Sequence, residues 1–292
     1  MRMILDTFWR VISFPTYLIY TSISLPFRLL RRFFQFLNTE PEERPLADVF
    51  ADLVTNDKVR AMLWDQVDIL RAHLLRSLIW LAIAIGIASY FTRDIIEFMA
   101  SPIGGLEALK AIEVTESVGV FMRVALLCGI ALAFPLIVFE LWWFAAPGLK
   151  PRERKMSLGG IPAATVFFLA GMAFAYFVML PTALPFLLNF MGIQAELRPQ
   201  SYFSFVTGIM FWIGMAFEFP LLIYILTAIG LIKPKTLANQ WRLAIVLIAI
   251  LSAAITPTVD PVNMALVMAP MSLLYFLSIG LSYIAYAGRQ RI

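Results

Sequence analysis

The chain is poor in charge, cysteine and histidine. Only 14% of its 292 residues are charged, whereas soluble domains carry about 25%. Its single cysteine and single histidine, Cys128 and His73, exclude an intramolecular disulfide, a thiolate metal site and a histidine-rich metal site. The sequence also lacks a phosphate-binding glycine loop, the H-E-x-x-H motif and a dinucleotide fingerprint. We therefore expect no metal, no cofactor and no enzymatic activity.

Apolar residues, by contrast, are abundant, at 61% of the chain with a mean hydropathy of +0.84. This composition predicts an all-α polytopic membrane protein, because too little polar surface remains to coat a soluble globule. A span needs about 20 mostly apolar residues, and six stretches qualify. They are roughly 74–92, 118–139, 158–180, 205–230, 243–258 and 263–286. The fifth is marginal, since Pro257 ends it early.

The basic residues are sorted between the two sides of the predicted spans. Nineteen lie on the side of the termini, and only Arg93, Lys110 and Arg198 lie on the other. The positive-inside rule therefore predicts that both termini are cytoplasmic. The net charge of +4 is too small to indicate a nucleic-acid partner.

The first 64 residues precede the predicted core, which is residues 65–292. Residues 1–37 carry polar side chains at helical spacing, which predicts an amphipathic helix on the membrane surface, its cationic face toward anionic lipids. Residues 38–64 are predicted to be a linker and a short helix. An additional span and a poorly ordered segment are the alternatives for the N-terminal stretch.

Ionisable residues within the predicted spans are candidates for function, because a charge there costs several kcal/mol. Glu218 lies mid-span beside Pro220, which we expect to leave a local backbone irregularity. It either hydrogen-bonds two helices together or forms a functional polar site. Arg123 is expected to be a snorkelling anchor or a partner of Glu116, and Glu140 is expected to face water.

A second group of candidates lies on the basic side. Glu153 is the one acid among four bases in residues 145–155, and Asp65 and Asp68 precede the first span. The simple interpretation is a salt bridge within the loop and an i,i+3 pair between Asp68 and Arg71. The alternative is an acidic spot that binds a cationic peptide through arginine–carboxylate hydrogen bonds. His73, near the inner end of the first span, is expected to snorkel or to pair.

Seven short motifs, in order along residues 65–288, resemble the TatC family, the multispanning receptor subunit of the twin-arginine protein translocase. They are Ser101-Pro102; Thr115-Glu116 with Arg123; Phe134-Pro135; Phe144–Leu149 with Glu153-Arg154; Gly171–Phe177 with Pro181; Phe217–Pro220; and Ile255–Asp260 with Pro261. Pro102, Pro135, Arg123 and Tyr176, within these motifs, are expected to be structural.

The resemblance implies a six-helix, glove-shaped bundle whose last two helices are too short to cross fully. It implies a protein of the bacterial inner membrane that binds the Arg-Arg signal peptides of folded preproteins. Single-span subunits of the TatA and TatB type then assemble with it, and the proton-motive force drives transport. Self-association and contact with membrane lipids are also expected.

The resemblance also implies roles for individual residues. Glu153 and an acid before the first span would bind the arginine pair, with Phe144 in the same patch. Glu218 would face the concavity of the bundle. The region around Thr256, with Asp260 and Met264, would contact the single-span subunits. Met264 stands at a position where members of the family frequently have Gln.

The lead-in to the first span departs from the family pattern H-L-x-E-L-R-x-R-L. Arg71 matches, but Ile69 stands at the Glu position and His73 at the second Arg position. Asp68 is one residue early, which turns its side chain by about 100° around a helix, so Asp65 is an alternative. The competing hypothesis is a secondary transporter or channel with Glu218 as its intramembrane site, but the halves of the chain show no internal similarity.

Overall fold

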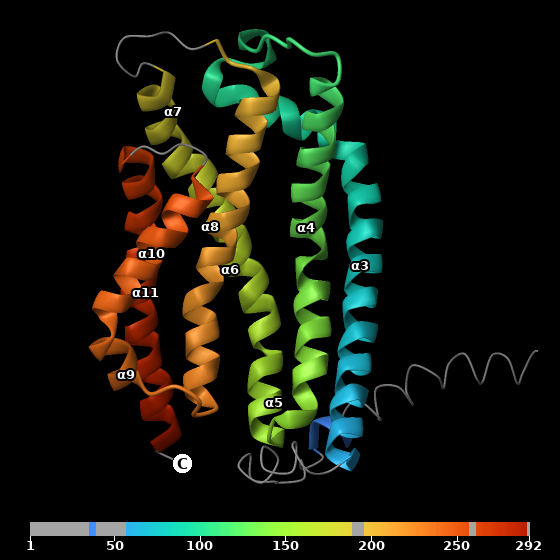
Figure 1. Cartoon of the computed structure of the whole chain (residues 1–292), viewed down its shortest axis with the longest axis vertical. Coiled ribbons are helices and arrows are strands. Elements are labelled where there is room, and N and C mark those ends of the chain that lie inside the picture. Colours follow the sequence, from blue (N-terminus) through green and yellow to red (C-terminus); the bar gives the residue numbers. More distant parts are fainter. Residues whose placement is uncertain (1–34, 39–56, 189–195, 257–260, 291–292) are drawn as a thin grey trace, which may run out of the picture.

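The computed structural model describes residues 35–38, 57–188, 196–256 and 261–290, and these residues are almost entirely helical (Figure 1). The predicted surface helix and linker lie outside this part of the chain, except for residues 35–38 and 57–64. Within it, extended pairing is limited to one bridge between Leu109 and Leu197.

Among the described residues, six helices of 15 residues or more form the bundle. They are α3 (Asp57–Ala100), α4 (Glu116–Ala145), α6 (Gly160–Phe174), α8 (Pro199–Ala228), α10 (Trp241–Ile255) and α11 (Pro261–Gln290). Shorter elements connect them: η1 (Ser101–Ile103), η2 (Leu106–Ala108), η3 (Ala146–Gly148), α5 (Pro151–Leu158), η4 (Ala175–Met179), α7 (Leu180–Leu188) and α9 (Pro234–Asn239).

Within the described residues, five helical segments are long and apolar enough to cross a membrane. The prediction of a multi-pass, all-helical membrane protein is therefore confirmed. The fifth predicted span corresponds to α10, which has 15 residues. At 1.5 Å per residue it is about 22 Å long, shorter than the roughly 30 Å of a bilayer's hydrocarbon core. Six complete spans therefore remain a prediction.

Close packing joins α3 to α4, and α8 to α4, α6 and α11. The core lies between these helices, where the buried rings of Phe134 and Phe168 stack with centroids 4.1 Å apart. Gly171 on α6 lies so close to α8 that a Cβ would stand 2.8 Å from the Gly214 Cα. Small residues therefore permit the backbone contact between these two helices, as is common in membrane bundles.

The third predicted span extends further than expected. The sequence predicts that this span ends near residue 180, but Pro181 and Pro185 both lie within α7, which continues from α6 through the π-helical turn η4. The reason is local: the wide turn of η4 directly precedes Pro181, where its ring would otherwise clash with the carbonyl four residues earlier. Likewise α8 continues through Pro220, so this proline does not end the helix.

The end of the bundle with η1 and η2, opposite α5, is closed by ion pairs and tyrosine hydrogen bonds. Arg198 binds Glu116 at 2.5 Å and Glu113 at 3.1 Å, and Arg123 donates to the Ser204 hydroxyl. The predicted pairing of Arg123 with Glu116 is therefore wrong, because Arg198, on the neighbouring helix end, takes the carboxylate. Tyr202 Oη donates to the Met99 carbonyl at 2.7 Å.

A candidate functional site at the α5 end

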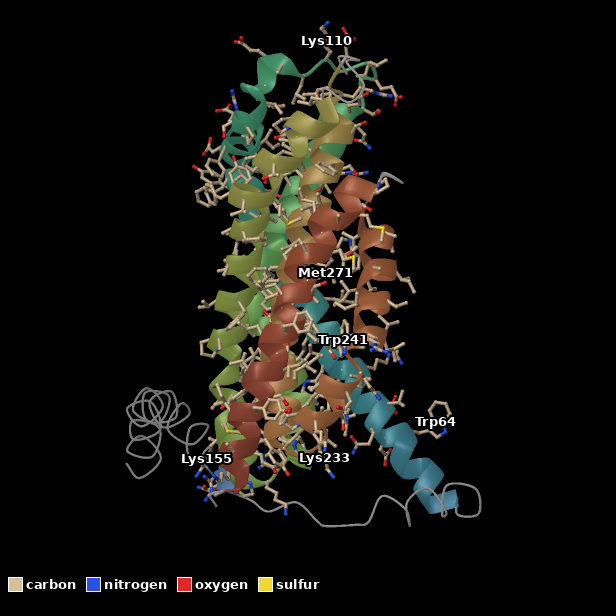
Figure 2. All side chains as sticks on the ribbon, turned by 90° about the vertical axis from the view of Figure 1, so that its left-hand side faces the viewer. Trp64, Lys110, Lys155, Lys233, Trp241 and Met271 are labelled. Atoms are coloured by element: carbon tan, nitrogen blue, oxygen red, sulfur yellow. The ribbon has the colours of Figure 1, made fainter. Side chains whose placement is uncertain are left out.

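The opposite end, called the α5 end here, gathers the start of α3, the turn between α4 and α6, and the end of α11 (Figure 1). Figure 2 shows Trp64, Lys155 and Lys233 near this end, whereas Lys110 lies at the other. Lys155 and Lys233, two of the basic residues that the sequence sorts to one side, thus lie at the same end of the bundle.

Arg154 organises the turn between α4 and α6. Its side chain lies in the turn with 2% of the residue exposed, Nε donates to the Ala146 carbonyl at 2.8 Å, and Nη2 donates to the Leu149 carbonyl at 3.1 Å. The carbonyls at the end of α4 and η3 are thereby satisfied by a cation, which suits the negative end of a helix dipole. This arginine is structural, and it fixes the start of the helix that carries Glu153.

Glu153 is partly exposed at the start of α5, where acids are favoured by the helix dipole. Its Oε2 accepts a hydrogen bond of 3.1 Å from the backbone N–H of Lys150. Glu153 also lines a cavity of about 320 Å³ between α5, α8 and α11, with Tyr224, Ile284 and Ala285 among its walls. A carboxylate of fixed orientation thus stands beside an open, largely apolar hollow.

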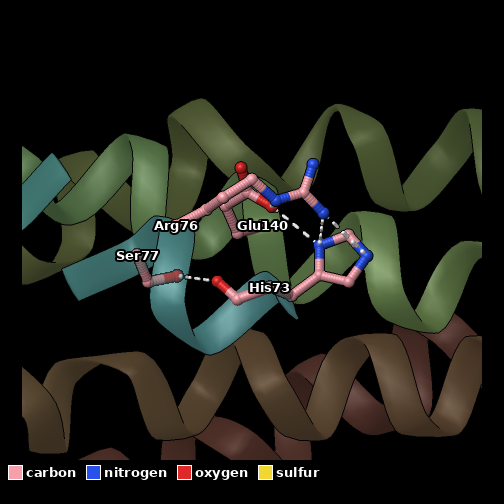
Figure 3. Close-up of polar contacts among 4 residues, drawn as sticks. All are labelled: His73, Arg76, Ser77 and Glu140. Atoms are coloured by element: carbon pink, nitrogen blue, oxygen red, sulfur yellow. Dashed lines mark hydrogen bonds and ion pairs between the residues drawn. The ribbon is translucent and has the colours of Figure 1, made fainter. Parts of the chain in front are cut away.

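His73 and Glu140 form a buried polar contact between α3 and α4 (Figure 3). Their nearest atoms, Nδ1 and Oε2, are 2.7 Å apart, and Arg76 Nε lies 3.5 Å from the same oxygen. If Nδ1–H donates to Glu140, Nε2 accepts from Arg76 Nη2 at 3.3 Å, so one tautomer satisfies both contacts. Glu140 does not face water as predicted, because α3 covers it, and His73 pairs with it.

Phe144 lies one turn beyond Glu140, and its ring centroid is 6.1 Å from that of His73 in an edge contact. The α3–α4 contact therefore sets the position of Phe144. Asp65, Asp68 and Arg71 are exposed on the same helix as His73. Within the described part of the chain Asp68 makes no ion pair, so the predicted Asp68–Arg71 pair is not formed.

Helix geometry separates these three residues of α3. At 100° per residue, Asp65 lies about 80° around the helix from His73, on the flank of Arg76, whereas Asp68 lies about 140° away and Arg71 about 160° away. His73 faces α4 and the turn before α5. Asp65 is therefore on the side of α3 nearer to Phe144, and Arg71 is on the opposite side.

The remaining predicted residues lie away from this end. Glu218 is half-buried in α8, and within the described residues its Oε1 has no hydrogen-bond partner. Tyr176 Oη donates to the Phe98 carbonyl at 2.7 Å, beside a cavity of about 570 Å³ lined by Pro102. Pro135 lies within α4.

The predicted partner contacts are only partly described. Thr256 is buried and its hydroxyl donates to the Ser252 carbonyl at 2.9 Å. Met264 is half-buried near the start of α11, and Asp260 lies outside the described residues. The exposed apolar side chains of this region lie instead along α10: Leu243, Val246, Leu247, Ile250 and Leu251.

Sequence reasoning missed the structural roles of Glu140 and Arg154. Glu140 is 67 residues from His73, and no local spacing connects them. Arg154 was counted among the loop cations, although its place between a helix end and a helix start is a typical setting for a capping cation.

Comparison with known proteins gives a consistent result. The family model described as "Sec-independent protein translocase protein (TatC)" matches residues 65–270. The protein of that name from Deinococcus radiodurans is 37% identical over 231 residues, which cover 76% of this chain and 86% of the relative. The Aquifex aeolicus protein is 32% identical, with coverage of 76% and 95%.

A solved structure agrees with these relatives. The "Crystal Structure of Twin Arginine Translocase Receptor- TatC" is 32% identical and superposes with a TM-score of 0.67, covering 75% of this chain and 99% of that one. The region that the family model matches begins within α3 at residue 65 and ends within α11 at residue 270, so residues 1–64 lie before it.

Proposed function

The chain belongs to the TatC family and is a component of a Sec-independent protein translocase, and from this premise we propose that it is the receptor for Arg-Arg signal peptides. In this proposal it binds the signal peptides of folded preproteins at the α5 end, which faces the cytoplasm of a bacterial inner membrane. Single-span subunits then assemble around it, and the proton-motive force drives transport.

The carboxylate of Glu153 carries this proposal. It is partly exposed in a turn whose other charged residues are basic, and the Lys150 N–H donates to one of its oxygens. A guanidinium can donate two parallel hydrogen bonds to a carboxylate, whereas an ammonium binds it as a point charge. Such a site therefore favours arginine over lysine in a bound peptide.

The second acid is expected on the lead-in part of α3. Asp65 is the better candidate, because its position around the helix is closer to the α4 side than that of Asp68. Phe144 would contribute apolar surface between the two acids, and its contact with His73 supports a fixed position. Arg71 points away from this side of α3, so we assign it no contact with the arginine pair.

Later steps would use other parts of the bundle. The exposed apolar face of α10, including Val246 and Ile250, is suited to a single-span helix in the membrane. Because Thr256 is buried, its role there would be to end α10 and not to touch the partner. Glu218, half-buried with an unpartnered oxygen, would act after signal binding.

Export of a folded Arg-Arg substrate in cells tests this function. Glu153→Ala should abolish export while the protein stays inserted and abundant, because the change removes the ligand for the guanidinium and no core contact. Glu107→Ala is the matched control, an exposed acid at the opposite end that should export normally. Full export by Glu153→Ala would contradict the proposal.

A further inference from the structure

A short helical segment ahead of the core, drawn in blue in Figure 1, docks on the turn between α4 and α6. The Phe36 ring stacks on Trp143, with centroids 5.5 Å apart and planes 14° apart. Leu37, 4% exposed, packs with Trp142 and Ala146. Two consecutive apolar side chains thus fill an aromatic niche on this turn.

Arg154 joins this segment to the turn. Its Nη1 donates to the Phe36 carbonyl, and its guanidinium carbon lies 4.3 Å from the centroid of the Phe36 ring. The same guanidinium donates to the carbonyls of Ala146 and Leu149. A buried cation is tolerated when its N–H groups have acceptors. Phe36 supplies one of these three carbonyls and also a ring face that covers the charge.

One peptide unit connects Arg154 to Glu153. The carbonyl of Leu149 accepts a hydrogen bond of 3.1 Å from Arg154 Nη2, and the N–H of Lys150 donates to Glu153 Oε2 at 3.1 Å. This carbonyl and this N–H belong to the same planar peptide unit, so a rotation of one moves the other. Arg154 therefore holds one side of a rigid group whose other side orients the Glu153 carboxylate.

The docked segment is separate from the hollow beside Glu153. The carboxylate lines that hollow with Tyr224, whereas the Phe36 ring packs on Trp143 and against Arg154. Phe36 therefore acts on the site through the arginine and not by contact with a peptide at the carboxylate. The family match begins at residue 65, so this support comes from a part of the chain outside the matched region.

We propose that Phe36 is a positioning residue for the Glu153 site and acts through Arg154. By holding the arginine, it fixes the peptide unit that orients the carboxylate. The inference rests on the proposed function, since it takes Glu153 as the site of the arginine pair. A bidentate guanidinium contact depends on the direction of the carboxylate, whereas an ammonium binds as a point charge. Loss of the docked segment should therefore weaken arginine binding more than lysine binding.

Peptide binding to the full chain in detergent tests the proposal. The probes are a fluorescent signal peptide with an Arg-Arg pair and the same peptide with Lys-Lys. Phe36→Ala should weaken Arg-Arg binding about three- to tenfold, the size of one lost hydrogen bond, and should weaken Lys-Lys binding less. Phe36→Tyr keeps the ring face and should bind as the unchanged chain does. Phe91→Ala, at an exposed phenylalanine toward the η1 end of α3, is the matched control and should leave both Kd values unchanged.

The outcomes separate this inference from the proposed function. If the unchanged chain prefers Arg-Arg to Lys-Lys and Phe36→Ala has the same Kd values, the positioning role is refuted and the receptor function stands. If Phe36→Ala weakens the binding of both peptides equally, the segment only stabilises the fold and the inference is also refuted. If the unchanged chain does not distinguish the two peptides, the receptor function fails and the inference with it.

Hydrogen exchange of the turn tests the structural step without any peptide. Phe36→Ala should speed exchange of the Lys150 amide, because the peptide unit loses its support. Phe36→Leu keeps apolar volume without the ring face, and it serves if Phe36→Ala does not fold. It should show a smaller change in the same direction, in both amide exchange and Arg-Arg affinity. Unchanged exchange at Lys150 in a folded variant would overturn the proposal.

Discussion

The two ends of the bundle use their charges differently. At the end with η1 and η2, acids and bases bind each other: Arg198 with Glu116 and Glu113, and Lys110 with Glu196 at 2.7 Å. At the α5 end, one base, Arg154, binds backbone carbonyls, and one acid, Glu140, is buried against His73. Two other acids stay accessible: Glu153 is partly exposed, and Asp65 is exposed.

This difference indicates which charges are structural. A carboxylate that is already paired and covered, such as Glu116, has little left to offer a ligand. A carboxylate held at a helix start by one N–H keeps acceptor positions for a guanidinium. By this criterion the α5 end also contains a structural pair, His73 with Glu140, beside the open acids.

The largest effect on stability is expected from Glu140→Ala. Removing Glu140 leaves the buried Nδ1–H of His73 without its acceptor, and a buried polar group left without a partner typically costs about 1–3 kcal/mol. Unfolding monitored by circular dichroism in detergent should therefore shift strongly to lower temperature. Glu140→Gln keeps an acceptor for His73 and should lose less. If Glu140→Ala were as stable as the unchanged chain, Glu140 would have no structural role.

Arg198→Ala should have the next largest effect on stability. It leaves the covered Glu116 without its ion pair, but Arg198 is 38% exposed, so water can partly replace it. The thermal midpoint should fall less than for Glu140→Ala, and the affinity for an Arg-Arg peptide should not change. Weaker peptide binding at unchanged stability would mean that the two ends do not differ in the way described.

A comparison of Asp65→Asn with Asp68→Asn sharpens the assignment at the α5 end. Because Asp65 lies nearer the α4 side, Asp65→Asn should weaken Arg-Arg peptide binding several-fold, while Asp68→Asn should change it little. Both are exposed, so thermal stability should be unaffected. The reverse order in binding titrations would show that the lead-in helix presents its other side to the peptide.

The smallest effect is expected from Lys110→Ala. The Lys110 ammonium holds the pKa of the Glu196 carboxyl below its usual range through a hydrogen bond. A lowered carboxyl pKa contributes stability above the unfolded-state pKa of about 4.3, and this is lost as the pH falls through the folded value. The pair is exposed, so thermal midpoints at pH 7 should nearly coincide, and a large drop would contradict this.

Hydropathy alone predicted much of the fold and only part of the site. Five spans and the shortness of α10 follow from apolar length and from Pro257. The π-helical turn at Tyr176 and the helical position of Pro181 did not follow, because proline reads as a break unless the preceding turn is known. The ion-pair partner of a charged side chain also depends on how the helices pack, which is why Arg198, and not Arg123, binds Glu116.

At the candidate site, the types of the residues in the sequence indicated their roles, whereas the contacts between them could not be predicted. Glu153 stands out as the one acid in a basic turn, and its resemblance to the family position adds to this. Its orientation by Lys150, and the support of its helix by Arg154, required the three-dimensional arrangement of the α4–α5 turn. The docking of Phe36 on that turn is a contact across 118 residues and has no local sequence signal.

The central claim is that an accessible acid at the α5 end, Glu153, binds the arginine pair of a signal peptide. Its most direct test is the affinity of the Arg-Arg and Lys-Lys peptides for the unchanged chain and for Glu153→Gln, measured side by side. The amide keeps the size of the side chain and removes its charge. We predict that the unchanged chain prefers Arg-Arg by about tenfold or more, as expected for a charge-assisted bidentate contact, and that Glu153→Gln loses this preference. An undiminished preference in Glu153→Gln would contradict the account.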